Sequence, residues 1–535
     1  MKKLLTLALA FVMCFGLVAC GDGGNNGGGS DTPVKGGTYI TSQVGEPLSM
    51  NPDTVSDDSL YAIAQNLYPR LVKLNNNYQA IPDLAKDMPE VSDDALTYTF
   101  KLHENAVWTD GEKVTSADVK YTYDEIIAKN YANAPVFAAV KSIETPDDYT
   151  VVFNMNQPDA SFLANVAWYG TFIMPKHVLE GKDWLSYTDF STVDGNVSCG
   201  PFKLDEWKTG ASVTLARNDD YFLAEPYLDY AVFQFDPDNQ TSYQNWVNGD
   251  VDEIASATIP TNELQSYIDD TTGDYIVVDQ EWPSPYYVTF NMNEGPFADA
   301  KVRLAVAKAI NREEVSQKAF SGHKPAQKYY ISNVYTDAHN DEAAEPDYDP
   351  EGAEKLLKEA GLTKNANGYY IESKFRIMNS GFTDMATVIV AELEKVGIKL
   401  EIDAMDSSAW ERDVWQAGNF EITCLAGFQG PDVLGSLRRW TKDGAINING
   451  YTRKEVEDLA AKALVSSSQE EINDIMKQIQ VYLAEDIPVL PMVSYVDKSV
   501  FKSYIHGHPM YSNAQGGSRD KAGFSELTYT WVDNQ

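Results

Sequence analysis

The chain is predicted to fold as an α/β protein in which helices cover sheets, because strand patterns and helix patterns alternate along its length. Residues 96–102 and 149–155 alternate apolar and polar side chains, which is the pattern of a half-buried strand. Asp349 followed by Pro350 predicts the start of a helix, since Asp caps helices and Pro suits the first helical position; Gly361 predicts its end. Such alternation favours layered α/β architecture.

Further segments extend the same pattern. Residues 213–215 predict a third strand, and residues 385–396 predict a helix that leads through Gly397 into a strand at 398–402. Thr115 begins a stretch typical of a helix N-cap with an acidic residue in the first turn. The chain therefore contains enough predicted elements for several layers.

The first residues predict export and anchoring. A basic start at residues 1–3 is followed by an apolar run at 4–18, which is shorter than the roughly 20 apolar residues that span a bilayer. Residues 17–20 resemble a bacterial lipobox, so we expect a signal peptide at 1–19 and lipidation of Cys20. The alternative is an ordinary signal peptide with an incidental cysteine.

Residues 20–34, rich in Gly, then predict a flexible tether. We expect a lipoprotein outside the cytoplasm, held by its acyl chains on the outer face of a bacterial cytoplasmic membrane or in the periplasm. No second membrane attachment is predicted.

Charge, length and cysteine content limit the binding partners, the number of domains and the disulfides that the chain can have. The formal charge of −37 argues against nucleic acid, whose phosphates require clustered Lys and Arg. The length is sufficient for two or three domains after the tether. Cys199 and Cys424 remain once Cys14 and Cys20 are assigned to the signal and the lipid site. A disulfide is permitted by the compartment, but we expect two buried free thiols.

Catalytic and metal-binding signatures are absent from the sequence. It contains no GxxxxGK[ST], HExxH or GxSxG pattern and has six histidines, so we do not expect an enzyme. His506 and His508, at two-residue spacing, would face one side of a strand. Without a third ligand they are interpreted as loop histidines, and no metal or cofactor is predicted.

A collinear series of segments resembles one known family. These segments lie at residues 66–72, 81–85, 96–102, 108–119, 173–179, 199–204, 217–221, 248–252, 296–305, 449–451 and 487–491. Together they resemble the solute-binding proteins of peptide-type ABC importers, the oligopeptide and dipeptide binding family (bacterial extracellular solute-binding family 5). Most of these residues are interpreted as scaffold, so the resemblance indicates the fold more than the ligand.

The resemblance implies a two-lobed periplasmic-binding-protein-like fold, with an extra inserted domain and three domains around a ligand cleft. Residues 282–285 (Trp-Pro-Ser-Pro) are the expected first crossing between lobes, because successive prolines bias the backbone to extended geometry and such crossings act as hinges. The implied boundaries are 35–56, 198–282 and 501–535 for the first lobe, 57–197 for its inserted domain and 283–500 for the second lobe.

The resemblance also implies a function. The chain would capture short peptides between its lobes and deliver them to ABC permease and ATPase subunits, as a monomer and without a cofactor. The alternatives are another solute of the same family, such as an oligosaccharide, a nickel complex or a haem complex, and a peptide-sensing surface lipoprotein without transport. Peptide length and sequence preference are not predicted.

In the family a carboxylate on the second lobe receives the peptide ammonium, because an unpaired buried charge is costly. Asp432 is the candidate here, although Gln429-Gly430 stands where the family more often has an earlier Asp. Asp432 is therefore either a ligand contact or a turn-former. In the second case the ligand would be a capped peptide, a glycan or another uncharged compound.

Other candidates surround this position or face it in the expected cleft. Aromatic side chains are both common cleft linings and common core fillers, so both interpretations stay open for them. Arg438 is interpreted either as a contact for a ligand carboxylate or as a partner in a surface salt bridge. The remaining predicted ligand-binding residues are Gly427, Phe428, Gln429, Trp410, Trp440, Tyr287, Glu46 and Arg438.

Overall fold

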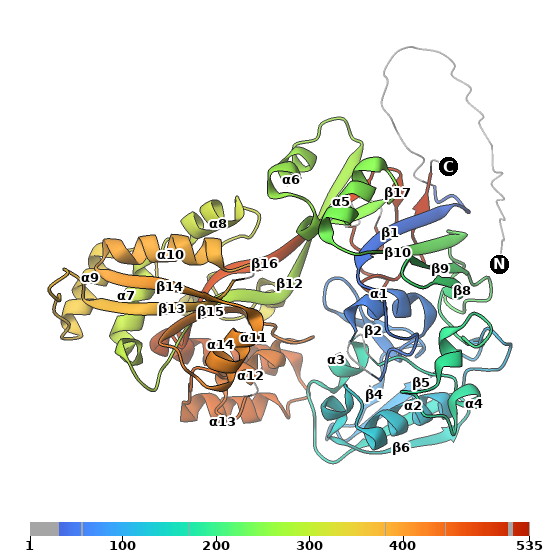
Figure 1. Cartoon of the computed structure of the whole chain (residues 1–535). Coiled ribbons are helices and arrows are strands. Elements are labelled where there is room, and N and C mark those ends of the chain that lie inside the picture. Colours follow the sequence, from blue (N-terminus) through green and yellow to red (C-terminus); the bar gives the residue numbers. More distant parts are fainter. Residues whose placement is uncertain are drawn as a thin grey trace, which may run out of the picture.

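A computed structural model describes residues 32–54, 57–168, 171–379, 381–444, 446–511 and 517–533. The predicted signal peptide and Cys20 lie outside the described residues. Figure 1 shows two lobes joined by a pair of long strands, so the predicted two-lobed α/β fold is confirmed. No helix in the described part of the chain is both long and apolar enough to cross a membrane.

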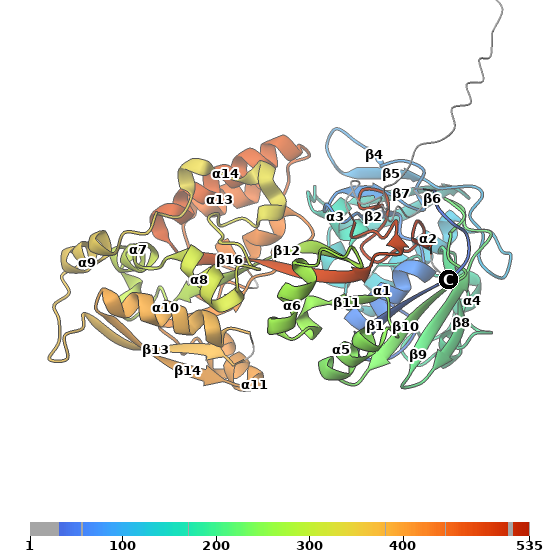
Figure 2. The same cartoon turned by 90° about the horizontal axis from the view of Figure 1, so that it is seen from above.

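The two lobes share one sheet. Strands β12 (Tyr275–Phe290) and β16 (Val489–Lys502) pair antiparallel and run from one lobe into the other (Figures 1 and 2). Their register shifts between Trp282 and Tyr286, where Pro283 and Pro285 cannot donate ladder hydrogen bonds. The strand order is β14-β13-β15-β12-β16-β11-β1-β10-β9-β8.

The first lobe contains the N-terminal half of this sheet. β1 runs parallel to β10, whereas β10, β9 and β8 form an antiparallel series. The predicted strand at 213–215 lies within β9 and is confirmed. The elements are β1 (Thr38–Val44), β8 (Phe202–Lys208), β9 (Ser212–Arg217), β10 (Tyr230–Asp236), β11 (Glu253–Ala255), α5 (Asn239–Asn248), α6 (Thr261–Ile268), β17 (Ile505–His506) and β18 (Trp531–Val532).

Between β1 and β8 the chain forms a second, four-stranded sheet in the order β4-β5-β7-β6. One buried apolar cluster includes Tyr39 of the large sheet and Phe100 of the small one, so the two share a core. Both predicted strands of this region, and the capping box at Thr115, are confirmed. The elements are α1 (Asp58–Leu67), β2 (Val72–Leu74), β3 (Ala80–Pro82), β4 (Glu90–Val91), β5 (Thr97–Lys101), α2 (Ser116–Lys129), β6 (Val140–Asp147), β7 (Thr150–Met155), α3 (Phe162–Ala167) and α4 (Lys176–Leu179).

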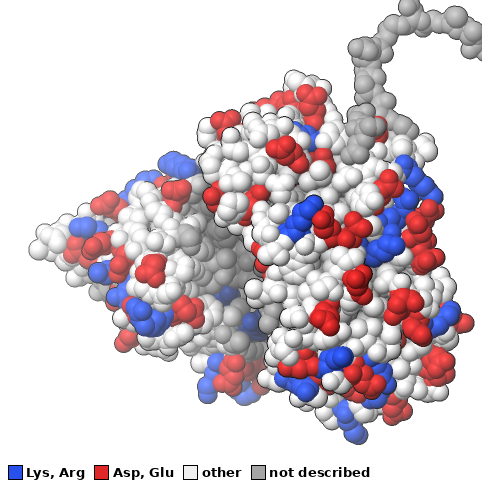
Figure 3. All heavy atoms as spheres, turned by 45° about the vertical axis from the view of Figure 1, so that its right-hand side comes forward, with Lys and Arg blue, Asp and Glu red and all other residues white. Residues whose placement is uncertain are grey.

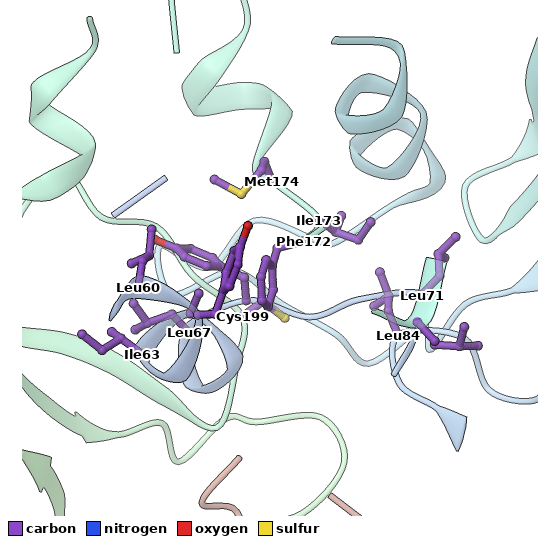
Figure 4. Packing of buried hydrophobic residues seen from close by; sticks show 14 of the residues in the cluster. Leu60, Ile63, Leu67, Leu71, Leu84, Phe172, Ile173, Met174 and Cys199 are labelled. Atoms are coloured by element: carbon purple, nitrogen blue, oxygen red, sulfur yellow. The ribbon is translucent and has the colours of Figure 1, made fainter. Parts of the chain in front are cut away.

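Three of the family-like segments of this lobe, at 66–72, 173–179 and 199–204, pack against one another as scaffold. The apolar face of α1 packs against residues 172–174 and Cys199 (Figure 4). The N–H groups of Cys199 and Gly200 both donate to the Leu67 carbonyl, at 3.0 and 2.7 Å. A Cβ at Gly200 would lie 2.4 Å from the Asn66 carbonyl oxygen, so only glycine allows this close approach.

The second lobe contains the other half of the large sheet and two groups of helices. One buried cluster joins the sheet to α7–α10, and a second includes residues of α12–α14. α9 begins as predicted: Asp349 accepts a hydrogen bond from the Gly352 N–H at 2.9 Å. The elements are α7 (Ala300–Ala309), α8 (Arg312–Phe320), α9 (Pro350–Glu359), β13 (Ile371–Met378), α10 (Thr383–Lys395), β14 (Ile398–Met405), α11 (Ser407–Trp410), β15 (Ile422–Ala426), α12 (Leu437–Trp440), α13 (Lys454–Ala463) and α14 (Gln469–Asp486).

Cys199 and Cys424 are buried and free, as the sequence predicted. Cys199 belongs to the core of the first lobe and Cys424 to that of the second. Burial raises the pKa of both thiols well above the ordinary value. They therefore behave as small apolar side chains.

Candidate binding cleft

A cavity of about 940 Å³ lies between the lobes. Figure 3 shows the hollow between them from one side. The first lobe contributes the β2–β3 turn, the segment after β4 and the start of α3; the second contributes the 3₁₀ segment η5 (Asn333–Ala338), residues 431–433 and the start of α14. The lining residues are Leu74, Asn77–Ala80, Val91–Asp93, Tyr98, Ala160, Leu163, Ala164, Val334–Ala338, Pro431–Val433, Ser466, Ser467, Gln469, Ile472 and Asn473.

Asp432 lines this cavity and also shapes the local backbone. Its carboxylate caps the short 3₁₀ segment η8 (Val433–Ser436) by accepting from the Gly435 N–H at 3.1 Å. It also accepts the Ser161 hydroxyl of the first lobe. Burial raises the pKa of Asp432 to about 6, so the carboxyl is only partly ionised in mildly acidic solution. The turn-forming role that the sequence left open is present.

The segment before Asp432 is an extension of β15 beside the crossing strand β12. The N–H groups of Gly427 and Gln429 donate to the carbonyls of Pro285 and Pro283, at 3.0 and 2.7 Å. Because alternate residues of an extended strand point their backbone groups to opposite edges, the N–H and C=O of Phe428 point away from β12.

Gln429 and Tyr287 are buried inside the second lobe, next to the cavity wall. The Gln429 amide donates to the Tyr330 carbonyl at 2.8 Å and accepts the Ser332 N–H at 2.7 Å, while the Tyr287 hydroxyl donates to Tyr330 at 2.9 Å. The Arg439 guanidinium lies 5.0 Å from the Tyr287 ring centre. These hydrogen bonds and the Arg439–Tyr287 contact hold in place the segment of the second lobe that leads to the cavity lining.

Gly427 and Trp440 complete this packed layer. A Cβ at Gly427 would lie 2.5 Å from Arg439 and 2.6 Å from the Tyr287 ring, so the position requires glycine. Trp440 is fully buried and meets Tyr287 edge to face, with ring centres 6.4 Å apart. Neither residue lines the cavity.

Three other predicted residues lie elsewhere in the structure. Trp410 is buried in a separate cluster of the second lobe, where its indole N–H donates to Thr423 at 3.2 Å. Glu46 is held within the first lobe, accepting the Trp207 indole N–H at 2.8 Å and the Gly210 N–H at 3.0 Å. Arg438 is exposed and does not line the cavity.

The structure brings several residues to the cavity that the sequence did not identify. Tyr78 projects from the β2–β3 turn, and its hydroxyl donates to the Glu281 carbonyl of β12 at 3.1 Å. Its ring meets that of Tyr335 from the second lobe, at 6.4 Å between centres. The Tyr335 hydroxyl in turn donates to the Gly430 carbonyl at 2.7 Å. Nothing local in the sequence distinguishes these two tyrosines from the chain's other tyrosines.

Further contacts join the lobes around the cavity. The Ala160 N–H donates to the Leu464 carbonyl at 3.0 Å. The rings of Trp168 and Phe428 lie 5.6 Å apart, so predicted Phe428 meets the opposite lobe although it is not among the lining residues. These contacts describe a conformation in which the lobes are closed on each other.

His506 and His508, whose spacing raised the question of a metal site, lie in different environments. His506 lies 3.0 Å from the Asp533 carboxylate, whereas His508 is buried against Phe501. Burial lowers the pKa of His508 to about 3, so it is neutral. In the described ranges, no group of three His, Cys, Asp or Glu side chains is arranged to hold a metal ion.

A two-lobed α/β protein with a cavity between lobes that share two crossing strands is the architecture of solute-binding proteins. The family model for bacterial extracellular solute-binding proteins, family 5 (middle region), matches residues 79–447. The chain belongs to this family of ABC-transporter solute-binding proteins.

Individual relatives cover nearly the whole chain. The oligopeptide-binding protein AppA of Bacillus subtilis is 26% identical over 513 residues, which is 91% of each chain. Heme-binding protein A of Haemophilus influenzae is 26% identical over 540 residues, covering 95% of this chain and 96% of its own.

Solved structures show the same fold. The ABC transporter substrate-binding protein CtaP of Listeria monocytogenes superimposes with a TM-score of 0.81 at 24% identity, covering 94% of this chain and 100% of its own.

Proposed function

We propose that the protein is the lipid-anchored, extracytoplasmic substrate-binding subunit of an ABC importer. It captures short peptides between its lobes and delivers them to the permease. The observation that carries this proposal is the cavity of about 940 Å³, which is lined by both lobes and contains a carboxylate beside a strand edge.

The cavity and the extended segment that leads to its wall suit a peptide. The Phe428 backbone groups, three residues before the lining residue Pro431, point away from β12 and can pair with an extended peptide as a further strand would. Asp432 supplies a carboxylate for the peptide ammonium, and charge-assisted hydrogen bonds of this kind are the stronger ones. Relatives named for oligopeptide binding support the same ligand class.

A haem or nickel complex receives less support from the cavity, although one relative is named for haem. Among the described lining residues there is no His, Cys or Met, the side chains that commonly bind haem iron, and His and Cys also bind nickel. Three tyrosines line the cavity, but their hydroxyls donate to the carbonyls of Glu281, Asp159 and Gly430.

Native mass spectrometry of the purified, untagged protein tests the ligand class. We expect co-purifying masses that fragment as peptides, and a mixture of synthetic peptides should replace them after the protein is stripped. Masses spaced like sugars, or a haem or metal complex alone, would overturn the peptide assignment.

Anchoring and delivery need their own tests. Cys20→Ser should move the protein from the membrane fraction to the soluble extracellular or periplasmic fraction, because acylation needs the thiol. Cells that lack the protein should lose uptake of a labelled captured peptide. Normal uptake in such cells would indicate a sensor without transport.

A further inference from the structure

The wall of the cavity carries charge of one sign only. Asp93 follows β4 in the first lobe, Asp337 lies on η5 in the second, and Asp432 lies deeper beside η8. Among the described lining residues there is no Lys, Arg or His. A bound solute therefore meets carboxylates from both lobes and no fixed cation.

These carboxylates have no basic partner within the part of the chain that the structure describes. Asp432 accepts its hydrogen bonds from neutral donors, the Gly435 N–H and the Ser161 hydroxyl. Asp93 and Asp337 are exposed at the cavity wall and form no ion pair with any described residue. Their charge is thus available to a ligand.

The lobe contacts bring a further carboxylate close to Asp432. Asp159 of the first lobe accepts the Ser161 N–H at 3.0 Å, while the Ser161 hydroxyl donates to Asp432 of the second lobe. After burial, the charge of Asp159 is the other influence that raises the pKa of Asp432. Closure therefore gathers like charges, and a positive group in the cavity offsets their repulsion.

The basic residue bonded to the wall is directed away from this group. Arg519 donates through Nε to the Asn77 side chain at 2.9 Å and through Nη1 to the Met510 carbonyl at 3.1 Å. It is absent from the cavity lining, and its guanidinium ties the β2–β3 turn to the C-terminal segment. Arg519 thus supports the turn from outside the cavity.

We infer that the cavity selects peptides with Lys or Arg side chains over neutral peptides, and both over peptides with Asp or Glu side chains. This inference rests on the proposed function and adds the charge class of the peptide. Asp93 and Asp337 interact with charged side chains of the peptide, whereas Asp432 binds the N-terminal ammonium of the peptide. Electrostatic complementarity of this kind gives specificity more than affinity.

The test uses a randomised pool of short peptides with free termini, equilibrated with the full-length protein, and mass spectrometry of the retained fraction. We expect enrichment of Lys and Arg and depletion of Asp and Glu. The Asp93→Asn/Asp337→Asn double variant should reduce the preference for basic over neutral peptides by about fivefold, the effect of two solvent-exposed charge pairs.

A matched control separates the cavity from the overall negative charge. Asp194 and Asp347 are exposed, lie one in each lobe and are absent from the cavity lining. The Asp194→Asn/Asp347→Asn variant removes the same two charges and should retain the preference. Equal thermal midpoints of the two double variants would show that both remain folded.

The outcomes separate the two proposals. Retained peptides with the average charge of the pool, or an equal loss of preference in both double variants, would overturn the charge inference while leaving peptide capture in place. Retention of no peptide at all would overturn the proposed function itself.

Discussion

Asp432→Asn tests the ligand contact with little disturbance of the fold. The Asp432 side chain caps η8 through the Gly435 N–H, and Asn is about as good a helix cap as Asp. The substitution preserves the size of the side chain and removes its charge. Any loss of peptide affinity is therefore a loss of the charge interaction.

The size of the effect follows from the burial of the carboxyl. A hydrogen bond to a charged group contributes about 1.5–3 kcal/mol, so we expect peptide affinity to fall about 10- to 150-fold in Asp432→Asn. With a pKa of about 6, Asp432 is mostly ionised at neutral pH and roughly one-tenth ionised one pH unit below its pKa.

The pH dependence has a definite sign. A ligand ammonium favours the ionised carboxyl, so affinity should be greatest above the pKa of Asp432 and fall about tenfold as the pH drops from about 7 to about 5. The peptide amine, whose ordinary pKa is near 8, stays protonated over this range. The Asn variant should lack this dependence.

Isothermal titration calorimetry with one captured peptide and its N-acetylated form measures both effects. Acetylation should weaken binding to the natural protein and change little in the variant. Equal affinities of the natural protein and the variant, with the same pH profile, would remove Asp432 from the ligand site.

Three further predictions concern closure, the core of the first lobe and the thiols. Tyr78→Ala removes the ring contact with Tyr335 of the opposite lobe, so apparent peptide affinity should fall about fivefold by calorimetry; unchanged affinity would contradict a role in closure. Lys73→Met leaves buried Glu526 without its cation at 2.6 Å, which should destabilise the protein by about 3–5 kcal/mol in denaturant unfolding, whereas a change below about 1 kcal/mol would refute the pairing. Cys199 and Cys424 should react with a thiol reagent only after unfolding, and prompt reaction of the native protein would show that they are accessible.

Much of the fold could be predicted because its signals are local. Asp349 caps α9 through the Gly352 N–H, and Gly361 beyond its end has a φ of +80°. Periodicity likewise located β7 and β9. The pairing of β12 with β16 could not be predicted in this way, because its register joins residues 200 or more positions apart.

The candidate site was less predictable because lining a cavity is a tertiary property. Asp432 was predicted because it supplies a carboxylate in the segment that resembles the family's ammonium-binding region, and it does line the cavity. Trp410 and Trp440 are large aromatic residues of the kind that commonly line clefts, but both are buried in packed clusters. Tyr78 and Tyr335 reach the cavity only because the lobes meet. Burial and exposure of aromatic residues depend on partners distant in sequence.

Small-angle X-ray scattering of the stripped protein, before and after addition of a captured peptide, tests most directly whether two lobes close over a ligand. The lobe contacts through Tyr78 and Phe428 belong to the closed conformation, which a bound peptide favours by its differential affinity. We predict a smaller radius of gyration with peptide than without it. Identical scattering under saturating peptide would contradict closure as the mechanism of capture.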